Sequence, residues 1–266
     1  MRRGLLLLLG WVSLLPLSPL GAEAGPRPSA DDIIERFLER CRTTPERLAA
    51  QHHTCVRRTV REELGADGQV KERKTKEHTV ELRGEEQRVR LLKLGTRAPT
   101  APENDRERAM ETEERRRFAE RKDKARERGP DFVDEKLIRR FRYEFAGTEP
   151  VDGRPAHVLK FTARPGRTAK DTSDRALDLL VGRIWIDAEE SELVKVDAHL
   201  KEPLGILGGI VAIVDRLDFT IERRRQQDGF WFNTGLGSYA EGRKLFSGFR
   251  VRTRIEQQDF HRLPEP

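Results

Sequence analysis

The sequence predicts a mainly β protein of the α+β class, built on one large antiparallel sheet that is curled or closed into a barrel. Strand-like runs and turn signals recur at the spacing of hairpins, without the regular alternation of strands and helices that indicates a parallel sheet. Several runs alternate polar with apolar residues, so one sheet face is buried and the other is wet. Charged residues are 37% of the 266 residues and hydrophobic residues 36%. This balance, with one apolar stretch, excludes a multi-span membrane protein.

The first residues have the pattern of an export signal. Arg2 and Arg3 precede an apolar run over Leu5–Leu15, and Ala22-Glu23-Ala24 places small residues at the two positions that a signal peptidase reads. The apolar run is shorter than the ~20 residues that a membrane anchor needs. We therefore expect residues 1–24 to be a signal peptide cleaved before Gly25. Residues 25–266 would then form a single periplasmic domain without a transmembrane span.

Charge and cysteine usage limit the partners further. The formal net charge is +6, but acidic and basic residues are interspersed and an exported protein rarely meets nucleic acid, so no nucleic-acid partner is expected. Cys41 and Cys55 could form a disulfide in an oxidising compartment or remain two buried thiols, and the sequence leaves both alternatives open. No Cys/His spacing typical of a metal site occurs. We therefore expect neither a metal nor another cofactor.

The N-terminal part is predicted to form helices followed by three polar strands. Ser29 is a good helix N-cap, and the apolar residues that follow it fall on one helical face: Ile33, Ile34, Phe37, Leu38 and Cys41. Pro45 suits the first turn of a second, short helix. The strand-like runs that come next are rich in lysine and arginine and end at glycine-containing turns; they cover residues 52–64, 70–83 and 87–94.

A charged insertion at about residues 100–141 separates these strands from the rest of the chain. Residues 96–104 are expected to be a linker. Residues 106–128 are expected to form a helix, because i,i+4 pairs such as Glu111–Arg115 support one. Few of its residues could pack, namely Met110, Phe118, Ala119 and Ala125. Two alternatives stay open: a solvated or partly disordered segment, and a basic arm that binds a partner.

From Phe141 onward the strand pattern becomes clearer. Asp152-Gly153 and Asp228-Gly229 are turn signals. An apolar segment with three glycines, residues 204–214, is predicted to be a flap, since glycine permits unusual backbone conformations. The strands expected in this half cover residues 141–145, 157–163, 183–187, 193–200, 217–223, 230–232, 236–240 and 245–255.

Five short motifs in this half occur in an order that resembles a known family. They are Asp152–Leu159 (DGRPAHVL), Gly182–Asp187 (GRIWID), Leu193–Val196 (LVKV), Asp228–Trp231 (DGFW) and Phe249–Arg252 (FRVR). This order resembles that of the LolA/LolB-like group of the outer-membrane lipoprotein-sorting superfamily. The resemblance implies an incomplete antiparallel β-barrel. The N-terminal helix and the charged insertion would lie over its open side, and its apolar interior would hold an acyl chain.

The resemblance makes the apolar residues of the later strands candidates for lining that interior. Ile184 and Ile186 share a face opposite Trp185, because neighbouring strand residues point to opposite faces. The alternative is that each candidate is an ordinary core residue. The full set of lipid-binding candidates comprises Ile184, Trp185, Ile186, Leu204, Ile206, Leu207, Ile210, Val211, Leu217, Phe219, Ile221, Phe230, Trp231 and Phe232.

The sequence carries no recognised catalytic motif. The signatures of zinc metallopeptidases, serine hydrolases, P-loop proteins and dinucleotide-binding proteins do not occur. We therefore expect an exported, non-enzymatic protein that holds a lipid or a lipoprotein acyl chain in an apolar cavity. The alternative from another class is an envelope sensor or protein-interaction module that uses the charged insertion to bind an envelope protein. A hydrolase whose site is assembled only in space is the third alternative.

Overall fold

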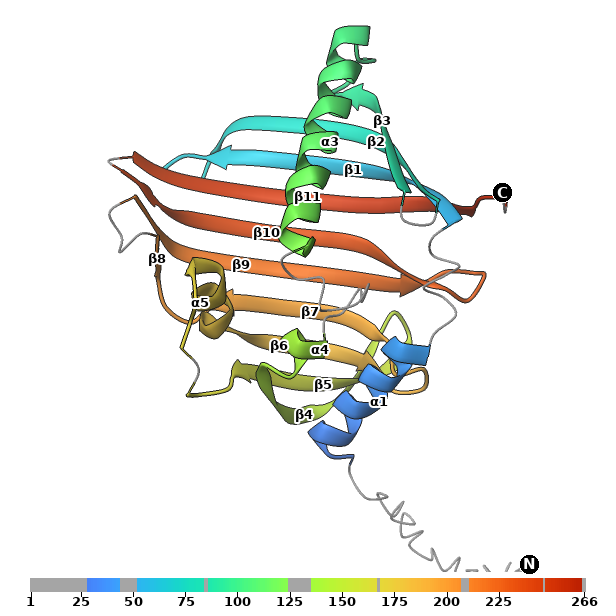
Figure 1. The fold of residues 1–266 in the computed structure, drawn as a ribbon, viewed down its shortest axis with the longest axis vertical. Coiled ribbons are helices and arrows are strands. Elements are labelled where there is room, and N and C mark those ends of the chain that lie inside the picture. Colours follow the sequence, from blue (N-terminus) through green and yellow to red (C-terminus); the bar gives the residue numbers. More distant parts are fainter. Residues whose placement is uncertain are drawn as a thin grey trace, which may run out of the picture.

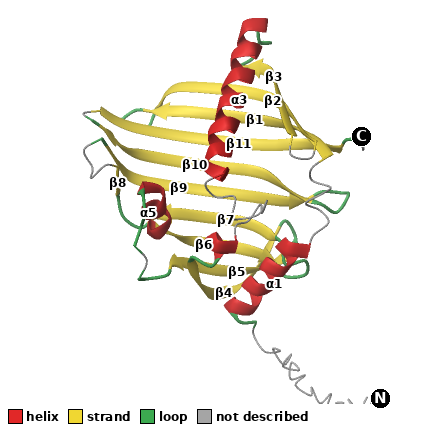
Figure 2. Cartoon of the chain, viewed as in Figure 1, coloured by secondary structure: helices red, strands yellow, loops and turns green. Residues whose placement is uncertain are grey.

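The computed structural model describes residues 28–43, 52–83, 86–123, 135–166, 168–206, 211–245 and 247–264. Within these ranges the chain forms a curved antiparallel sheet of eleven strands with four helices (Figures 1 and 2). The sheet is open, because its path ends at β3 on one side and at β4 on the other. The predicted fold class is therefore confirmed, in its open rather than its closed form.

The strands follow the order β3-β2-β1-β11-β10-β9-β7-β6-β5-β4 across the sheet, and the short β8 pairs with β9. Hairpins connect most neighbours, but β1 pairs with β11, which joins the N-terminal strands to the last strand of the chain. The strands are β1 His52–Leu64, β2 Val70–Arg83, β3 Glu86–Leu94, β4 Phe141–Val151, β5 Arg154–Ala163, β6 Leu180–Asp187, β7 Leu193–Leu200, β8 Leu204–Ile206, β9 Ala212–Arg225, β10 Trp231–Lys244 and β11 Ser247–Arg262.

The N-terminal helix α1, Ala30–Thr43, begins where the sequence predicts it. The Ser29 hydroxyl accepts a hydrogen bond from the Asp32 N–H at 3.0 Å, which caps the first turn. The predicted apolar face is buried against the sheet, with Phe37 only 1% exposed. The short helix predicted after Pro45 and the predicted signal peptide lie outside the described residues.

The charged helix α3, Ala101–Asp123, begins five residues earlier than predicted, so the linker expected over residues 96–104 is partly wrong. Thr100 caps the helix: its N–H and its hydroxyl both donate to the Glu103 carboxylate, at 2.8 and 3.0 Å. Arg97 binds the same carboxylate. This is a capping arrangement, in which a side chain three residues into the helix satisfies the N-terminal backbone.

The later strands extend well past their predicted ends. β9, β10 and β11 each continue through charged residues, because those residues lie on a face that tolerates them while the backbone keeps pairing. The predicted flap is partly strand: residues 204–206 form β8, and β9 begins at Ala212. Residues 207–210 lie outside the described residues.

All four described helices lie on one face of the sheet, which we call the helix face. α1, α4 (Glu135–Ile138) and α5 (Thr172–Leu179) pack on β4–β7, while α3 runs across β2, β1 and β11 as far as β10 (Figure 1). The pairing register shows that the helix face is one continuous surface. A single row of directly paired residues leads from the core under α1 to Lys76, which contacts α3. That row is Ile184, Val196, Ile221, Leu236, Ile255, Thr59 and Lys76.

Candidate functional site

The middle of the helix face carries apolar side chains that remain partly exposed. They come from β9, β10 and β11, between the strands covered by α1, α4 and α5 and those that bind α3. Leu236 is 38% exposed, and the others are half-buried. We call this set the apolar strip: Leu217, Phe219, Ile221, Leu236, Val251 and Ile255.

The covering helix α3 has no apolar stripe to bury this strip. Its sequence is APENDRERAMETEERRRFAERKD, in which Met110 and Phe118 are the large apolar residues, and Met110 is 56% exposed. A helix that seals a core presents apolar residues at i, i+3, i+4 and i+7. The sequence of α3 therefore offers the apolar strip no continuous apolar face to pack against.

The predicted lipid-binding residues divide between two faces of the sheet. Ile184, Ile186 and Leu204 are buried in the packed core under α1, and Leu217 and Phe219 pack against that core while half-buried. The expected opposition of Ile184 and Ile186 to Trp185 is confirmed, since Trp185 is buried in a separate cluster with Val158, Val194 and Trp231.

Of the remaining candidates, Ile221 belongs to the apolar strip and the others lie outside it. Phe232 stacks on Phe260, with ring centroids 4.6 Å apart. Phe230, Ile206 and Ile221 are half-buried, Val211 is 36% exposed, and Leu207 and Ile210 fall outside the described residues. Sequence reasoning missed Leu236, Val251 and Ile255 as members of a site, because the pairing register alone brings Leu236 beside β9 and the other two beside β10.

The helix face becomes basic where it continues onto β1 and β2. Glu107 of α3 lies against this region and binds Lys76 Nζ at 2.7 Å and His78 Nε2 at 3.1 Å. His78 is only 3% exposed. Two buried atoms here, Arg57 Nε and His78 Nδ1, have no hydrogen-bond partner among the described residues. Arg57 is paired with Gln257 and His78 across neighbouring strands, so it shares their face.

Burial and charge shift the pKa values of this contact. Burial lowers the pKa of His78 below its ordinary value of 6.5, and the positive charge of Arg57 lowers it further, while Glu107 opposes both. Burial would raise the pKa of Glu107, but Lys76 and His78 outweigh it and hold that pKa below its ordinary value. The contact therefore combines an ionised carboxylate with a histidine that stays neutral near neutral pH.

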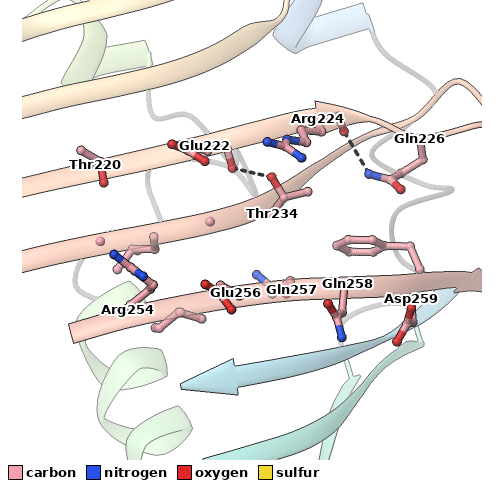
Figure 3. Close-up of a pocket in the computed structure, with 15 residues that line it drawn as sticks. Thr220, Glu222, Arg224, Gln226, Thr234, Arg254, Glu256, Gln257, Gln258 and Asp259 are labelled. Atoms are coloured by element: carbon pink, nitrogen blue, oxygen red, sulfur yellow. Dashed lines mark hydrogen bonds between the residues drawn. The ribbon is translucent and has the colours of Figure 1, made fainter. Parts of the chain in front are cut away.

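The opposite face of the sheet carries a polar trough of about 680 Å³ over β9, β10 and β11 (Figure 3). Its floor includes Gly237, where a Cβ would come within 2.7 Å of Thr220 Oγ1. Its sides are rows of polar side chains from the two flanking strands: Thr220, Glu222 and Arg224 on β9, and Arg254, Glu256 and Gln258 on β11. These side chains are too polar for an apolar ligand, so the apolar strip is the better candidate site for one.

Cys41 and Cys55 are not bridged to each other. Cys55 lies in a small cluster with Val80 and Val89, and its thiol is 3.4 Å from Gln257 Oε1. Cys41 packs against the core under α1, in the other half of the sheet. The bridged alternative is therefore not the one observed, because the two thiols belong to different clusters.

Two further features bear on function. Among the described residues, no group of three or more His, Cys, Asp or Glu side chains is arranged to hold a metal ion. No helix in the same part of the chain combines the length and the hydropathy that crossing a membrane requires.

Acidification from about pH 7 to about pH 5 is expected to destabilise the protein partly through His78. Its pKa is lowered in the folded state, so the unfolded chain takes up a proton first, and stability falls as the pH drops below the unfolded value of about 6.5. His78→Gln, which keeps a donor for Glu107, should flatten the slope of unfolding free energy by at most ~1.4 kcal/mol per pH unit. Urea titrations would measure it.

The exposed His261 provides the matched control, since His261→Gln should leave the slope as in the wild type. An unchanged slope in His78→Gln would show that His78 does not stay neutral in the fold.

Comparisons with known proteins give structural resemblances at low sequence identity. No protein-family model matches the chain, and no curated protein matches it. A domain named for outer membrane lipoprotein sorting, from Vibrio parahaemolyticus, is 9% identical with a TM-score of 0.35, over 87% of this chain and 91% of that one. A LolA superfamily protein from Nitrosomonas europaea is 11% identical with a TM-score of 0.30, over 90% and 95%.

The Pseudomonas aeruginosa MucA/MucB complex contains a chain that is 11% identical, with a TM-score of 0.25, over 88% of this chain and 99% of that one. The resemblance to the lipoprotein-sorting superfamily that the sequence motifs predict is thus also found among solved structures, as a distant likeness of fold.

Proposed function

We propose that this protein is a non-enzymatic binding protein of the cell envelope that holds the acyl chain of a lipid or lipoprotein against the apolar strip. The observation that carries the proposal is the incomplete burial of six apolar side chains on a sheet face that helices otherwise cover. An apolar surface left beside a polar helix is a typical place for an apolar ligand.

The dimensions of the strip suit a single extended chain. Leu217, Phe219 and Ile221 alternate along β9 and therefore span about 13 Å, at ~3.3 Å per residue. Leu236 and Ile255 continue the surface over two more strands, each about 4.8 Å further on. Each methylene that such a surface removes from water contributes about 0.8 kcal/mol, so a ligand with a long chain would gain more than a short one.

Binding of an acyl chain on the apolar strip does not require the core under α1 to open. Ile184, Ile186 and Leu204 are packed there with Phe37, so they support the strip from one side. The contacts of α3 are polar where they are described, through Glu107 to Lys76 and His78. The described contacts of α3 therefore place no apolar packing in the way of a ligand that enters between this helix and β9–β11.

Replacing Leu236 by asparagine is expected to weaken binding of a dansyl-labelled fatty acid by about tenfold, because a partly exposed leucine contributes on the order of 1.4 kcal/mol when a ligand covers it. A fluorescence titration of the purified protein measures this. Leu245→Asn is the matched control: Leu245 is 65% exposed in the turn between β10 and β11 and outside the strip. Equal affinities of both variants would contradict the proposed location.

The proposed location in the envelope depends on export, which the N-terminal pattern supports. Protein recovered from a periplasmic extract is expected to begin at Gly25. N-terminal sequencing or intact-mass spectrometry would measure this directly. Recovery of a chain that retains Met1 in the cytoplasm would contradict the envelope role.

A second candidate function is an envelope sensor or interaction module in which α3 binds a protein partner. The exposure of Met110 on a helix of otherwise charged sequence favours it. A photo-reactive residue at position 110 should then form one discrete cross-linked product in cells. The same photo-reactive residue placed at position 70 should not form such a product. Val70 lies in β2 and is 42% exposed. If no cross-linked product forms from position 110 while fatty-acid binding is intact, the interaction role of α3 is contradicted and the acyl-chain function is the one that stays supported.

A further inference from the structure

The helix face changes from apolar to basic along a continuous surface. Ile255, at the edge of the apolar strip, is paired with Thr59 on β1, and Thr59 is paired with Lys76 on β2. Arg57 lies two residues from Thr59 on the same face, hence about 7 Å along the strand. A molecule that lies on the strip therefore has a cationic side chain on the next strand, two residues along from its end.

Among the described residues, no counter-charge is paired with the half-buried guanidinium of Arg57. In the described part of the chain no hydrogen bond or ion pair is made by its side chain, and its Nε is buried without an acceptor. The carboxylate described beside it, that of Glu107, is used by Lys76 and His78. Removing a charge from water without pairing it costs free energy, so this position favours an added anion.

His78 restricts what that anion can contact. Its Nε2 faces the Glu107 carboxylate, so the tautomer with the proton on Nε2 satisfies that contact, and Nδ1 is left as an acceptor. A neutral His78 therefore cannot donate to an anion through Nδ1. The donors available at this end of the strip are the guanidinium of Arg57 and the ammonium of Lys76.

We propose that the ligand is a single-chain amphiphile with an anionic headgroup, its chain on the apolar strip and its headgroup on Arg57. This inference rests on the proposed function and names the class of ligand. An anionic oxygen would accept charge-assisted hydrogen bonds from the Arg57 fork, which are stronger than those between neutral groups. Lys76 adds positive charge on the same face, although it is also bound to Glu107.

The test compares a dansyl-labelled undecanoic acid with its methyl ester, which has the same chain and no charge. The wild type should bind the acid about tenfold more tightly than the ester, as expected for one hydrogen-bonded charge. Arg57→Gln should bring the ratio close to one by weakening the acid alone. Arg57→Lys, which keeps the charge, should retain part of the preference.

Arg58 provides a control one residue away. It is exposed and is paired with Glu256 and Glu77, so it lies on the opposite face of the sheet. Arg58→Gln should keep the wild-type ratio, although it removes the same charge. Thermal unfolding of both variants would separate lost binding from lost folding.

The outcomes distinguish the two proposals. If neither probe binds the wild type, the acyl-chain function itself fails. If both probes bind it equally, the strip binds apolar chains and the anionic headgroup is ruled out, whether or not Arg57→Gln folds. If the acid is preferred and Arg58→Gln removes that preference as fully as Arg57→Gln, the effect is one of net charge and the assignment to Arg57 is overturned.

Discussion

The pairing of β1 with β11 is the constraint on which the rest of this structure depends. β1, β2 and β3 are very polar, and the buried apolar cluster that they form is small. It consists of Cys55, Val80 and Val89, with Phe260 of β11 packed against it. A small sheet with so little apolar surface is marginal by itself in water. Ten directly paired positions join β1 to β11 and extend the C-terminal sheet into the N-terminal strands. The polar strands are therefore held by backbone pairing to a sheet whose core lies elsewhere.

The pairing of β1 with β11 also determines which contacts α3 can make with the sheet. The helix crosses strands that present lysine, arginine and histidine on their helix face, and it meets them with Glu107. Exposed ion pairs contribute at most about 1 kcal/mol each, and the partly buried ones lose much of their attraction to desolvation. Where its side chains are described, α3 covers the sheet through such contacts, without the apolar burial that holds α1. This difference explains how one face of a single sheet can carry both a packed core and a surface open to a ligand.

Much of the fold could be predicted from local sequence. The bounds of β1 and β2 were predictable because glycine turns flank them, and α1 because Ser29 caps an amphipathic run. The start of α3 was missed because the prolines of residues 96–104 indicated a linker, although Thr100 and Glu103 have the spacing of a capping box. Within the candidate site, the face shared by Leu217, Phe219 and Ile221 follows from the two-residue period of a strand.

Strand register accounts for the part that local sequence could not predict. Leu236 and Ile255 are separated in sequence from β9, and the pairing of β10 with β9 and β11 brings all three strands side by side. β10 and β11 also looked shorter in the sequence, because charged residues interrupt their apolar pattern. On β11 those residues include Arg254 and Glu256, which lie on the opposite face and form one side of the polar trough.

Arg57 and Arg58 show that the surroundings of a strand residue depend on which face of the sheet its position gives it. The two residues are adjacent and chemically identical, so amino-acid composition does not distinguish them. Arg58 is directed to the opposite face, where its cross-strand neighbours are the acidic residues Glu256 and Glu77. Arg57 is directed to the helix face, beside Gln257 and His78, where the nearby carboxylate has other partners. A shift of one residue in the β1–β11 register would exchange these roles. The same pairing that holds the polar strands to the sheet therefore places Arg57, which has no counter-charge among the described residues, at the end of the apolar strip, as the proposed anionic amphiphile would require.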